Sequence, residues 1–134
     1  MSTRLAPSMT PDTQFFWDGV KDHRLLIQRC TECHMLRHPP RPMCPRCNSV
    51  SWDTVESRGR GRIFSFVMPH HPSYPWFEYP YIVVLVDLDE GIRLVSNLCG
   101  VAPEAVSIGM PVTVFYEHFD NGLVLPLFTL DSQP

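Results

Sequence analysis

The sequence has none of the long hydrophobic runs that mark a membrane protein. A helix that spans a bilayer needs about 20 consecutive apolar residues, whereas the longest clean apolar run here, Tyr81–Val86, has the length of a strand. The first ten residues also lack the apolar core of a secretion signal. We therefore expect a cytoplasmic protein with no membrane partner.

Basic residues are almost missing from the second half of the chain. Beyond Arg62, one arginine stands against eight acidic residues, whereas the segment from Lys21 to Arg62 carries nine Lys and Arg against four acidic residues. A charge division of this kind predicts two modules with different partners. The acidic second module argues against a nucleic-acid groove, because such a groove has to attract phosphates.

The proline content argues against a helix bundle, since 14 of the 134 residues are proline and the usual share is about 5%. One short helix is predicted at 11–18, with Thr10 capping its first turn and Gly19 ending it. Hairpin turns are predicted at 89–91 and 120–122. The expected strands lie at 61–68, 81–88, 92–98, 111–119 and 123–130, with a strand at 51–57 running into the first.

Five short antiparallel strands cannot hide both their apolar faces and their edges in a flat sheet, whereas a small closed barrel hides both. We expect a five-stranded OB-fold barrel, and the strand count leaves an SH3-like barrel open as the alternative. The chain is then mainly β. Its expected parts are a tail and helix at 1–23, a cysteine-rich ribbon at 24–57 and the barrel at 58–134.

Four of the five cysteines form two Cys-x-x-Cys pairs, Cys30 with Cys33 and Cys44 with Cys47. Two such pairs can supply the four thiolates of a tetrahedral zinc site, and their spacing leaves a rubredoxin-type iron site open as the alternative. Four cysteines close the coordination sphere, so we expect a structural rather than a catalytic metal. Cys99 lies at a strand end and is expected to be a small buried side chain.

No recognisable catalytic set accompanies the cysteines, because the sequence has neither a nucleophile motif nor a glycine-rich phosphate loop. His70 and His71 could form an acid–base site with neighbouring tyrosines and a glutamate, but we favour a loop that docks on a partner. Arg58, Arg60 and Arg62 alternate near the junction of the two modules. Such a row is either a phosphate contact or a solvated face.

Several segments form a recognisable set together with the cysteine pairs. They are Phe16-Trp17-Asp18-Gly19, Leu26–Cys33, Pro39–Cys47, the Gly59-x-Gly61-x-Ile63-x-Ser65 turn, Pro80-Tyr81, Leu88–Gly91 and Gly109–Val112. Over about residues 14–130 the chain resembles a family of small proteins, formerly a domain of unknown function, in which a rubredoxin-like zinc ribbon precedes an OB-fold.

The resemblance implies an accessory subunit rather than an enzyme. Members of that family are often encoded beside, or fused to, acyl-CoA enzymes. In steroid side-chain breakdown such a domain is fused to a MaoC-type enoyl-CoA hydratase and binds a thiolase-fold aldolase. The resemblance thus implies a zinc-containing, non-catalytic subunit that binds a thiolase-fold aldolase or thiolase in a hetero-oligomer. The chain has no room for a hydratase domain, so we expect a stand-alone relative or an excised domain.

The expected partner interface combines two aromatic segments, because aromatic side chains are favoured at the centres of interfaces. Two alternatives stay open, which are binding of single-stranded nucleic acid and independent binding of acyl-CoA through the arginine row. The predicted interface residues are Phe15, Phe16 and Trp17 in the helix and His70, His71, Tyr74, Trp76 and Phe77 in the loop.

Overall fold

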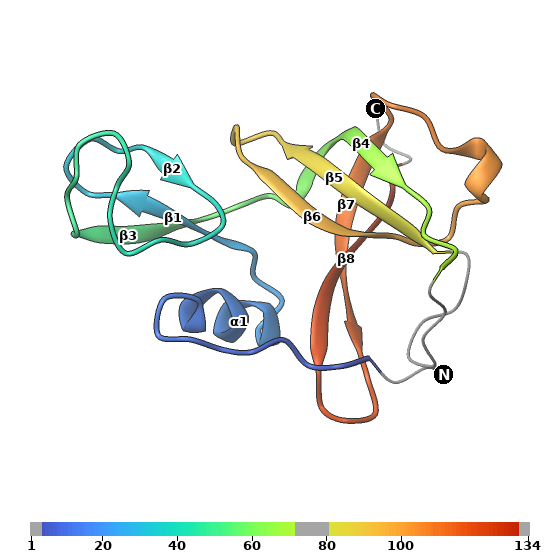
Figure 1. Ribbon diagram of the computed structural model, residues 1–134, viewed down its shortest axis with the longest axis horizontal. Coiled ribbons are helices and arrows are strands. Elements are labelled where there is room, and N and C mark those ends of the chain that lie inside the picture. Colours follow the sequence, from blue (N-terminus) through green and yellow to red (C-terminus); the bar gives the residue numbers. More distant parts are fainter. Residues whose placement is uncertain (1–3, 72–80, 132–134) are drawn as a thin grey trace.

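The computed structural model describes residues 4–71 and 81–131. Figure 1 shows a small sheet beside a barrel, with a helix next to both. The helix, α1, spans Gln14–Lys21. The strands are β1 (Leu26–Cys30), β2 (Leu36–Arg37), β3 (Trp52–Glu56), β4 (Arg60–Val67), β5 (Ile82–Leu88), β6 (Arg93–Leu98), β7 (Pro111–His118) and β8 (Val124–Leu130), and a 3₁₀ turn, η1, covers Pro103–Ala105.

Helix α1 begins three residues later than predicted and continues past Gly19 to Lys21. The expected cap by Thr10 was wrong, because Thr13 is the N-cap residue and no side chain caps the helix. Thr10 lies in the preceding turn, where its carbonyl oxygen accepts backbone N–H groups at 2.9 and 3.0 Å. The expectation that Gly19 ends the helix was wrong. A Cβ at Gly19 would lie 2.9 Å from the Leu26 side chain, so glycine here lets the following chain fold back against the helix.

The aromatic residues of α1 hold the helix against the rest of the chain. Phe16 is 5% exposed and shares one apolar core with the barrel strands. Its ring contacts Trp17 edge-on at 4.9 Å, and the Phe15 ring lies 4.8 Å from that of Trp52 in the ribbon. Burial of a side chain such as Phe16 contributes about 1.5–3 kcal/mol, which fixes the position of this short helix.

The ribbon is a three-stranded antiparallel sheet in the order β2-β1-β3. Leu26 pairs with Glu56 at one end of the β1–β3 ladder, and Cys30 pairs with Trp52 at the other. The strand predicted at 51–57 therefore belongs to the ribbon and does not run into the barrel. The pairing explains the difference, because β3 forms its hydrogen-bonded ladder with β1 and is an edge strand of the ribbon sheet.

The junction between ribbon and barrel requires glycine at two positions. Gly59 has a φ of +72°, in the left-handed region that favours glycine, and a Cβ there would collide with the Val114 side chain on β7. A Cβ at Gly61 would collide with the backbone carbonyl of Asp87 on β5. These two close approaches place the expected turn between β3 and the first barrel strand.

The second half forms a closed barrel in the order β4-β5-β6-β8-β7, which is the predicted OB-fold. The neighbouring pairs are antiparallel except for β6 and β8, which meet in parallel at Leu98 and Phe128. Both predicted hairpin turns connect the expected strands, with left-handed glycines at Gly91 and Gly122. The core of the barrel is filled by buried side chains of Ile63, Val84, Val86, Val112 and Phe128.

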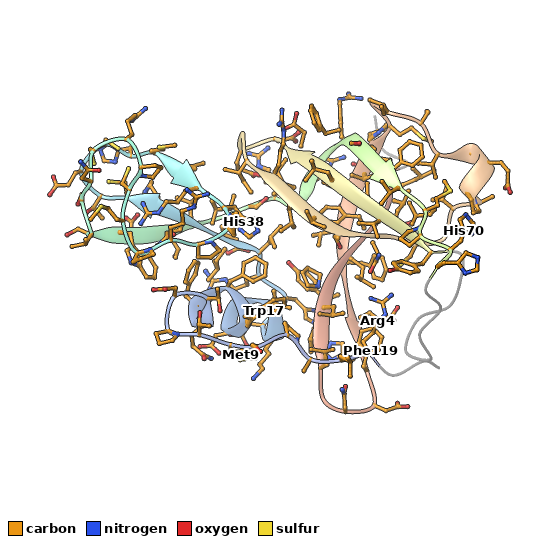
Figure 2. The ribbon with its side chains drawn as sticks, in the orientation of Figure 1. Arg4, Met9, Trp17, His38, His70 and Phe119 are labelled. Carbon is orange, nitrogen blue, oxygen red and sulfur yellow. The ribbon has the colours of Figure 1, made fainter. Side chains whose placement is uncertain are left out.

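Polar contacts tie the N-terminal arm and the end of α1 to the barrel. Arg4 Nη1 donates to Asn97 Oδ1 at 2.9 Å, and Figure 2 shows Arg4 close to Phe119 of the β7–β8 turn. Just beyond α1, the Nε2 atoms of His23 and His118 lie 2.7 Å apart. The helix is therefore attached to the barrel on both sides.

Candidate metal centre and adjoining cavities

The four cysteine sulfurs of the ribbon all lie within 4.8 Å of one another. The Sγ atoms of Cys30 and Cys47 are 3.5 Å apart, and those of Cys33 and Cys44 are 3.6 Å apart. A tetrahedral zinc site with Zn–S bonds of about 2.3 Å separates its sulfurs by about 3.8 Å. The four side chains thus have the spacing that a tetrahedral thiolate site requires.

Two matching turns hold these sulfurs. The backbone N–H of His34 donates to the Cys30 carbonyl, and that of Asn48 donates to the Cys44 carbonyl, both at 2.9 Å. His34 and Asn48 also share a left-handed backbone, with φ of 64° and 63°. Since both Cys-x-x-Cys turns repeat one geometry, each directs its pair of sulfurs toward a common centre.

The backbone favours the thiolate form of three cysteines. N–H groups two or three residues further along the chain lower the pKa of Cys30, Cys33 and Cys44. For Cys47, the Ser49 N–H also lowers the pKa, but the hydrogen bond with the Cys30 sulfur, burial and the other sulfurs together raise it to about 12. A divalent cation supplies the charge that lets all four sulfurs bind as thiolates.

The cluster is suited to a structural metal. Among the described residues, no histidine or carboxylate joins the four sulfurs. The nearby His38 instead lies against Phe16, with ring centroids 5.3 Å apart, and burial lowers its pKa. Four sulfurs complete a tetrahedron and leave no position for a substrate. Outside the cluster, Cys99 is half-buried, and burial raises its pKa.

The predicted arginine row does not form one free face. Arg60 forms an ion pair with Asp131 at 2.8 Å, and Arg62 donates to the Gly109 carbonyl at 3.0 Å. Arg58 is exposed at the junction. Two of the three guanidinium groups are thus engaged within the barrel, and a phosphate contact by this row stays a prediction.

The predicted interface residues have unequal access to a partner. Phe16 is buried in the core, which is at odds with direct contact, whereas Phe15 and Trp17 are half-buried. His70 and His71 are exposed beyond the end of β4, where Figure 2 shows His70. The other predicted loop residues lie outside the described part of the chain, namely Tyr74, Trp76 and Phe77.

Sequence reasoning missed two cavities where helix, ribbon and barrel meet. The first, named the apolar cavity, has a volume of about 470 Å³. Trp17 and His38 approach it from the helix and the ribbon (Figure 2), and Val95 and Leu127 line it from the barrel. No local sequence pattern predicts this cavity, because the residues that line it come from segments far apart in the chain.

The second cavity, named the arginine cleft, lies between the ribbon and the β5–β6 hairpin and has a volume of about 380 Å³. Arg37 and Arg41 line it from the ribbon, and Arg93 lines it from β6. The sequence did not predict this group of arginines, since they come from two modules that carry opposite net charges.

Of the helices in the described residues, none is both long enough and apolar enough to cross a membrane.

Two family models match the chain in succession. The model described as "ChsH2, rubredoxin-like zinc ribbon domain" covers residues 17–51, and "ChsH2, C-terminal OB-fold domain" covers residues 54–116. A Pyrococcus furiosus relative, described as a DUF35 domain-containing scaffold protein, is 32% identical over 82% of this chain and 85% of its own length. The chain belongs to the DUF35 family. The family resemblance predicted from the motifs is therefore confirmed.

A solved structure similar to this DUF35 chain is described as "Ltp2-ChsH2(DUF35) aldolase". It has a TM-score of 0.89 and 49% identity, and the match covers 92% of this chain and 98% of that one. The Thauera aromatica relative "Benzoylsuccinyl-CoA thiolase subunit BbsA" is 29% identical over 70% of this chain and 69% of its own length.

Other relatives of this DUF35 chain are much longer. "3-oxo-4,17-pregnadiene-20-carboxyl-CoA hydratase alpha subunit" of Mycobacterium tuberculosis is 47% identical over 87% of this chain. The chain spans only 37% of the length of this relative and 39% of the length of another relative, which is described as a probable enoyl-CoA hydratase alpha subunit.

Proposed function

We propose that this chain is a non-catalytic accessory subunit that binds a thiolase-fold acyl-CoA enzyme, an aldolase or a thiolase, in a hetero-oligomer. The observation that carries the proposal is the close similarity to the DUF35 chain of a solved aldolase. The names of the scaffold and thiolase-subunit relatives support it. The name of the M. tuberculosis relative adds steroid side-chain degradation as the expected setting.

The metal in this proposal is a structural Zn²⁺ held by Cys30, Cys33, Cys44 and Cys47. The sulfur spacing fits such an ion, and the description of the matching ribbon model favours zinc over iron. A ribbon of this size has little apolar core of its own, so metal binding supplies much of its folding free energy. The role of the metal is then to hold the ribbon against the helix and the barrel.

The described side chains also favour an accessory role over catalysis. Glu90 accepts hydrogen bonds from the Ser57 hydroxyl at 2.7 Å and from the Arg58 N–H at 3.0 Å. Asp87 lies 3.6 Å from Arg93. Glu90 therefore connects the β5–β6 hairpin to the junction, and Asp87 pairs within the hairpin. With both carboxylates engaged in this way, we expect the isolated chain to have no aldolase, thiolase or hydratase activity.

An apolar surface on the barrel is suited to the docking of such a partner. We name it the outer barrel face and define it by Val67, Val83, Leu85 and Val95. Val67 pairs with Val83, and Leu85 pairs with Val95, across β4, β5 and β6. Val67 is 58% exposed and Val95 is 65% exposed. Val83 and Leu85 are half-buried between them, and a contiguous apolar surface of this kind marks protein interfaces.

The experiment that tests the proposal is co-expression of this chain with a thiolase-fold aldolase or thiolase from its native host. We expect the two chains to co-elute in size-exclusion chromatography, with a mass by light scattering that corresponds to a hetero-oligomer. A barrel-only OB-fold protein expressed with the same tag serves as the control for non-specific capture. If the two chains elute separately at micromolar concentration, the proposed function is wrong.

A further inference from the structure

We propose that His23 and His118 form a second divalent-metal site, in which their two Nε2 atoms bind one Zn²⁺ ion that braces the end of α1 against β7. The inference goes beyond the accessory function, because it concerns neither the partner enzyme nor the cysteine cluster. It rests on the position of the two rings, on the backbone of His23 and on the charges around the pair.

The two rings come from separate elements and meet at their Nε2 atoms. His23 lies just beyond the end of α1, and His118 is the last residue of β7. The two Nε2 atoms are 2.7 Å apart, and the ring planes are inclined at 55°. A tetrahedral Zn²⁺ with Zn–N bonds of about 2.0–2.1 Å separates two nitrogens by about 3.3 Å, so the rings have to move apart by about 0.6 Å. Both side chains are exposed, which leaves room for this movement.

The fold fixes His23 through both its backbone and its ring. The residue has a φ of +59°, in the left-handed region that is unfavourable for a residue with a side chain, and its N–H donates to the Val20 carbonyl at 2.9 Å. Its ring stacks on that of Tyr116, with centroids 4.8 Å apart and planes inclined at 9°. Tyr116 and His118 lie on the same side of β7, because they are two residues apart. Unfavourable backbone conformations that the surrounding structure enforces occur at ligand sites.

The charges around the pair are compatible with a bound cation. Arg24, the residue after His23, pairs with Glu56 at 3.0 Å, so its positive charge is compensated. Burial and the charge of Glu56 raise the pKa of Tyr116 to about 12, so this phenol keeps its proton and does not compete as a ligand. Among the described residues, no third histidine, cysteine or carboxylate joins the pair. Water therefore completes the coordination of the ion.

The chemistry of the two rings favours Zn²⁺ over the common hard cations. Imidazole nitrogens suit zinc, copper and nickel, whereas Mg²⁺ and Ca²⁺ prefer oxygen ligands. In the metal-free pair one Nε2 donates a hydrogen bond and the other accepts it. When Zn²⁺ binds, the donating ring moves its proton to Nδ1, so that both Nε2 lone pairs form bonds to the ion and no proton is released.

The test is calorimetric titration of Zn²⁺ into the full chain, which should take up two equivalents. The second should bind more weakly than the first, because two protein ligands hold it instead of four. His23→Gln and His118→Gln should each abolish the second equivalent and retain the first. Long-range ¹H–¹⁵N NMR of the histidine rings should show the metal on Nε2 of both. Amide exchange at 22–24 should slow when the second ion binds, since the ion ties the end of the helix to β7.

His71→Gln is the matched control, since His71 is an exposed histidine beyond the end of β4, and this variant should bind both ions. Tyr116→Phe keeps the stacked ring and should also bind both. The inference is wrong if the unmodified chain binds a single Zn²⁺, or if His23→Gln and His118→Gln keep the second ion. It is also wrong if Tyr116→Phe loses that ion, because the phenol oxygen is then a ligand, or if His71→Gln loses it, because the ion then lies at the other end of the barrel sheet.

Discussion

Individual residues at the junction of ribbon and barrel are constrained by steric limits rather than by chemistry. Gly59 combines a left-handed backbone with close contact to β7, and Gly61 lies against the backbone of β5. At the metal centre the constraint is chemical, because the four sulfurs have to bind one metal ion together. Substitutions at the glycines should therefore destabilise the fold through steric collision, whereas substitutions at the cysteines should destabilise it through loss of the metal.

Gly59→Ala should destabilise the fold by about 1–3 kcal/mol, since the new methyl group overpacks against Val114. Gly122→Ala is the matched control, because Gly122 has a similar φ of +80° and no atom within 4 Å of an added Cβ. Urea unfolding of both variants separates the collision from the backbone strain that they share. Equal losses of stability in the two variants would show that the contact with Val114 is unimportant.

Cys44→Ser should abolish stoichiometric metal binding and disorder the ribbon, since the Cys44 side chain is buried in the cluster. Elemental analysis and near-ultraviolet circular dichroism measure the two effects. Cys99→Ser changes a cysteine outside the cluster and should keep its metal. A folded Cys44→Ser protein that still holds one metal ion per chain would contradict the four-sulfur site.

Among the elements, the ribbon strands depend on polar pairs as well as on the metal. Arg29 on β1 lies directly opposite Asp53 on β3, and two of its nitrogens donate to the two carboxylate oxygens at 2.9 and 2.7 Å. The pair therefore helps to fix the register of β1 against β3.

Arg29→Gln should raise the pKa of Asp53, because the hydrogen bond from Arg29 is the main cause that lowers it. A lowered carboxyl pKa stabilises the fold above the unfolded value of about 3.9. This contribution is lost as the pH falls through the folded value. Carboxyl-carbon NMR titration measures the shift, and an Asp53 pKa that is the same in both proteins would contradict the pairing.

The elements also show what the sequence can and cannot predict. Hairpin turns, cysteine knuckles and barrel strands depend on local signals such as Asp120-Asn121-Gly122, and the structure contains them. The end of α1 was misjudged because Gly19 is explained by a contact with Leu26, which no local pattern records. The expectation that the strand at 51–57 runs into the first barrel strand failed for the same reason, since the partner of β3 lies more than 20 residues earlier in the chain.

At the scale of the whole molecule, function is expected where separate elements meet. The apolar cavity and the arginine cleft each combine ribbon and barrel residues that are distant in sequence, so neither could be predicted from the order of the residues. The metal centre could be, because its ligands lie in two short motifs. The outer barrel face could be predicted in part. Alternation along a strand predicts which side chains point outward, but it does not show which of them the helix and the ribbon leave exposed.

Val67→Glu should weaken assembly with the thiolase-fold partner roughly tenfold or more, because it places a charge on the outer barrel face. Ile108→Glu is the matched control, since Ile108 is 68% exposed and lies between η1 and β7, away from that face. Analytical ultracentrifugation of both variants with the partner measures the difference. Unchanged affinity for Val67→Glu would place the interface elsewhere on the chain.

The pairing of β1 with β3 has a further consequence for how this architecture can be altered. The ribbon leaves the helix at Leu25 and returns at Ser57, and the Ser57 N–H donates to the Leu25 carbonyl at 2.8 Å. The residues at which the chain enters and leaves the ribbon are therefore adjacent, so the ribbon has the geometry of an insertion that can be removed and its flanking ends joined. Lineages could exchange, lose or remodel the metal-binding segment while the helix and barrel keep their connection, and a short turn from Leu25 to Ser57 would make the same excision in the laboratory.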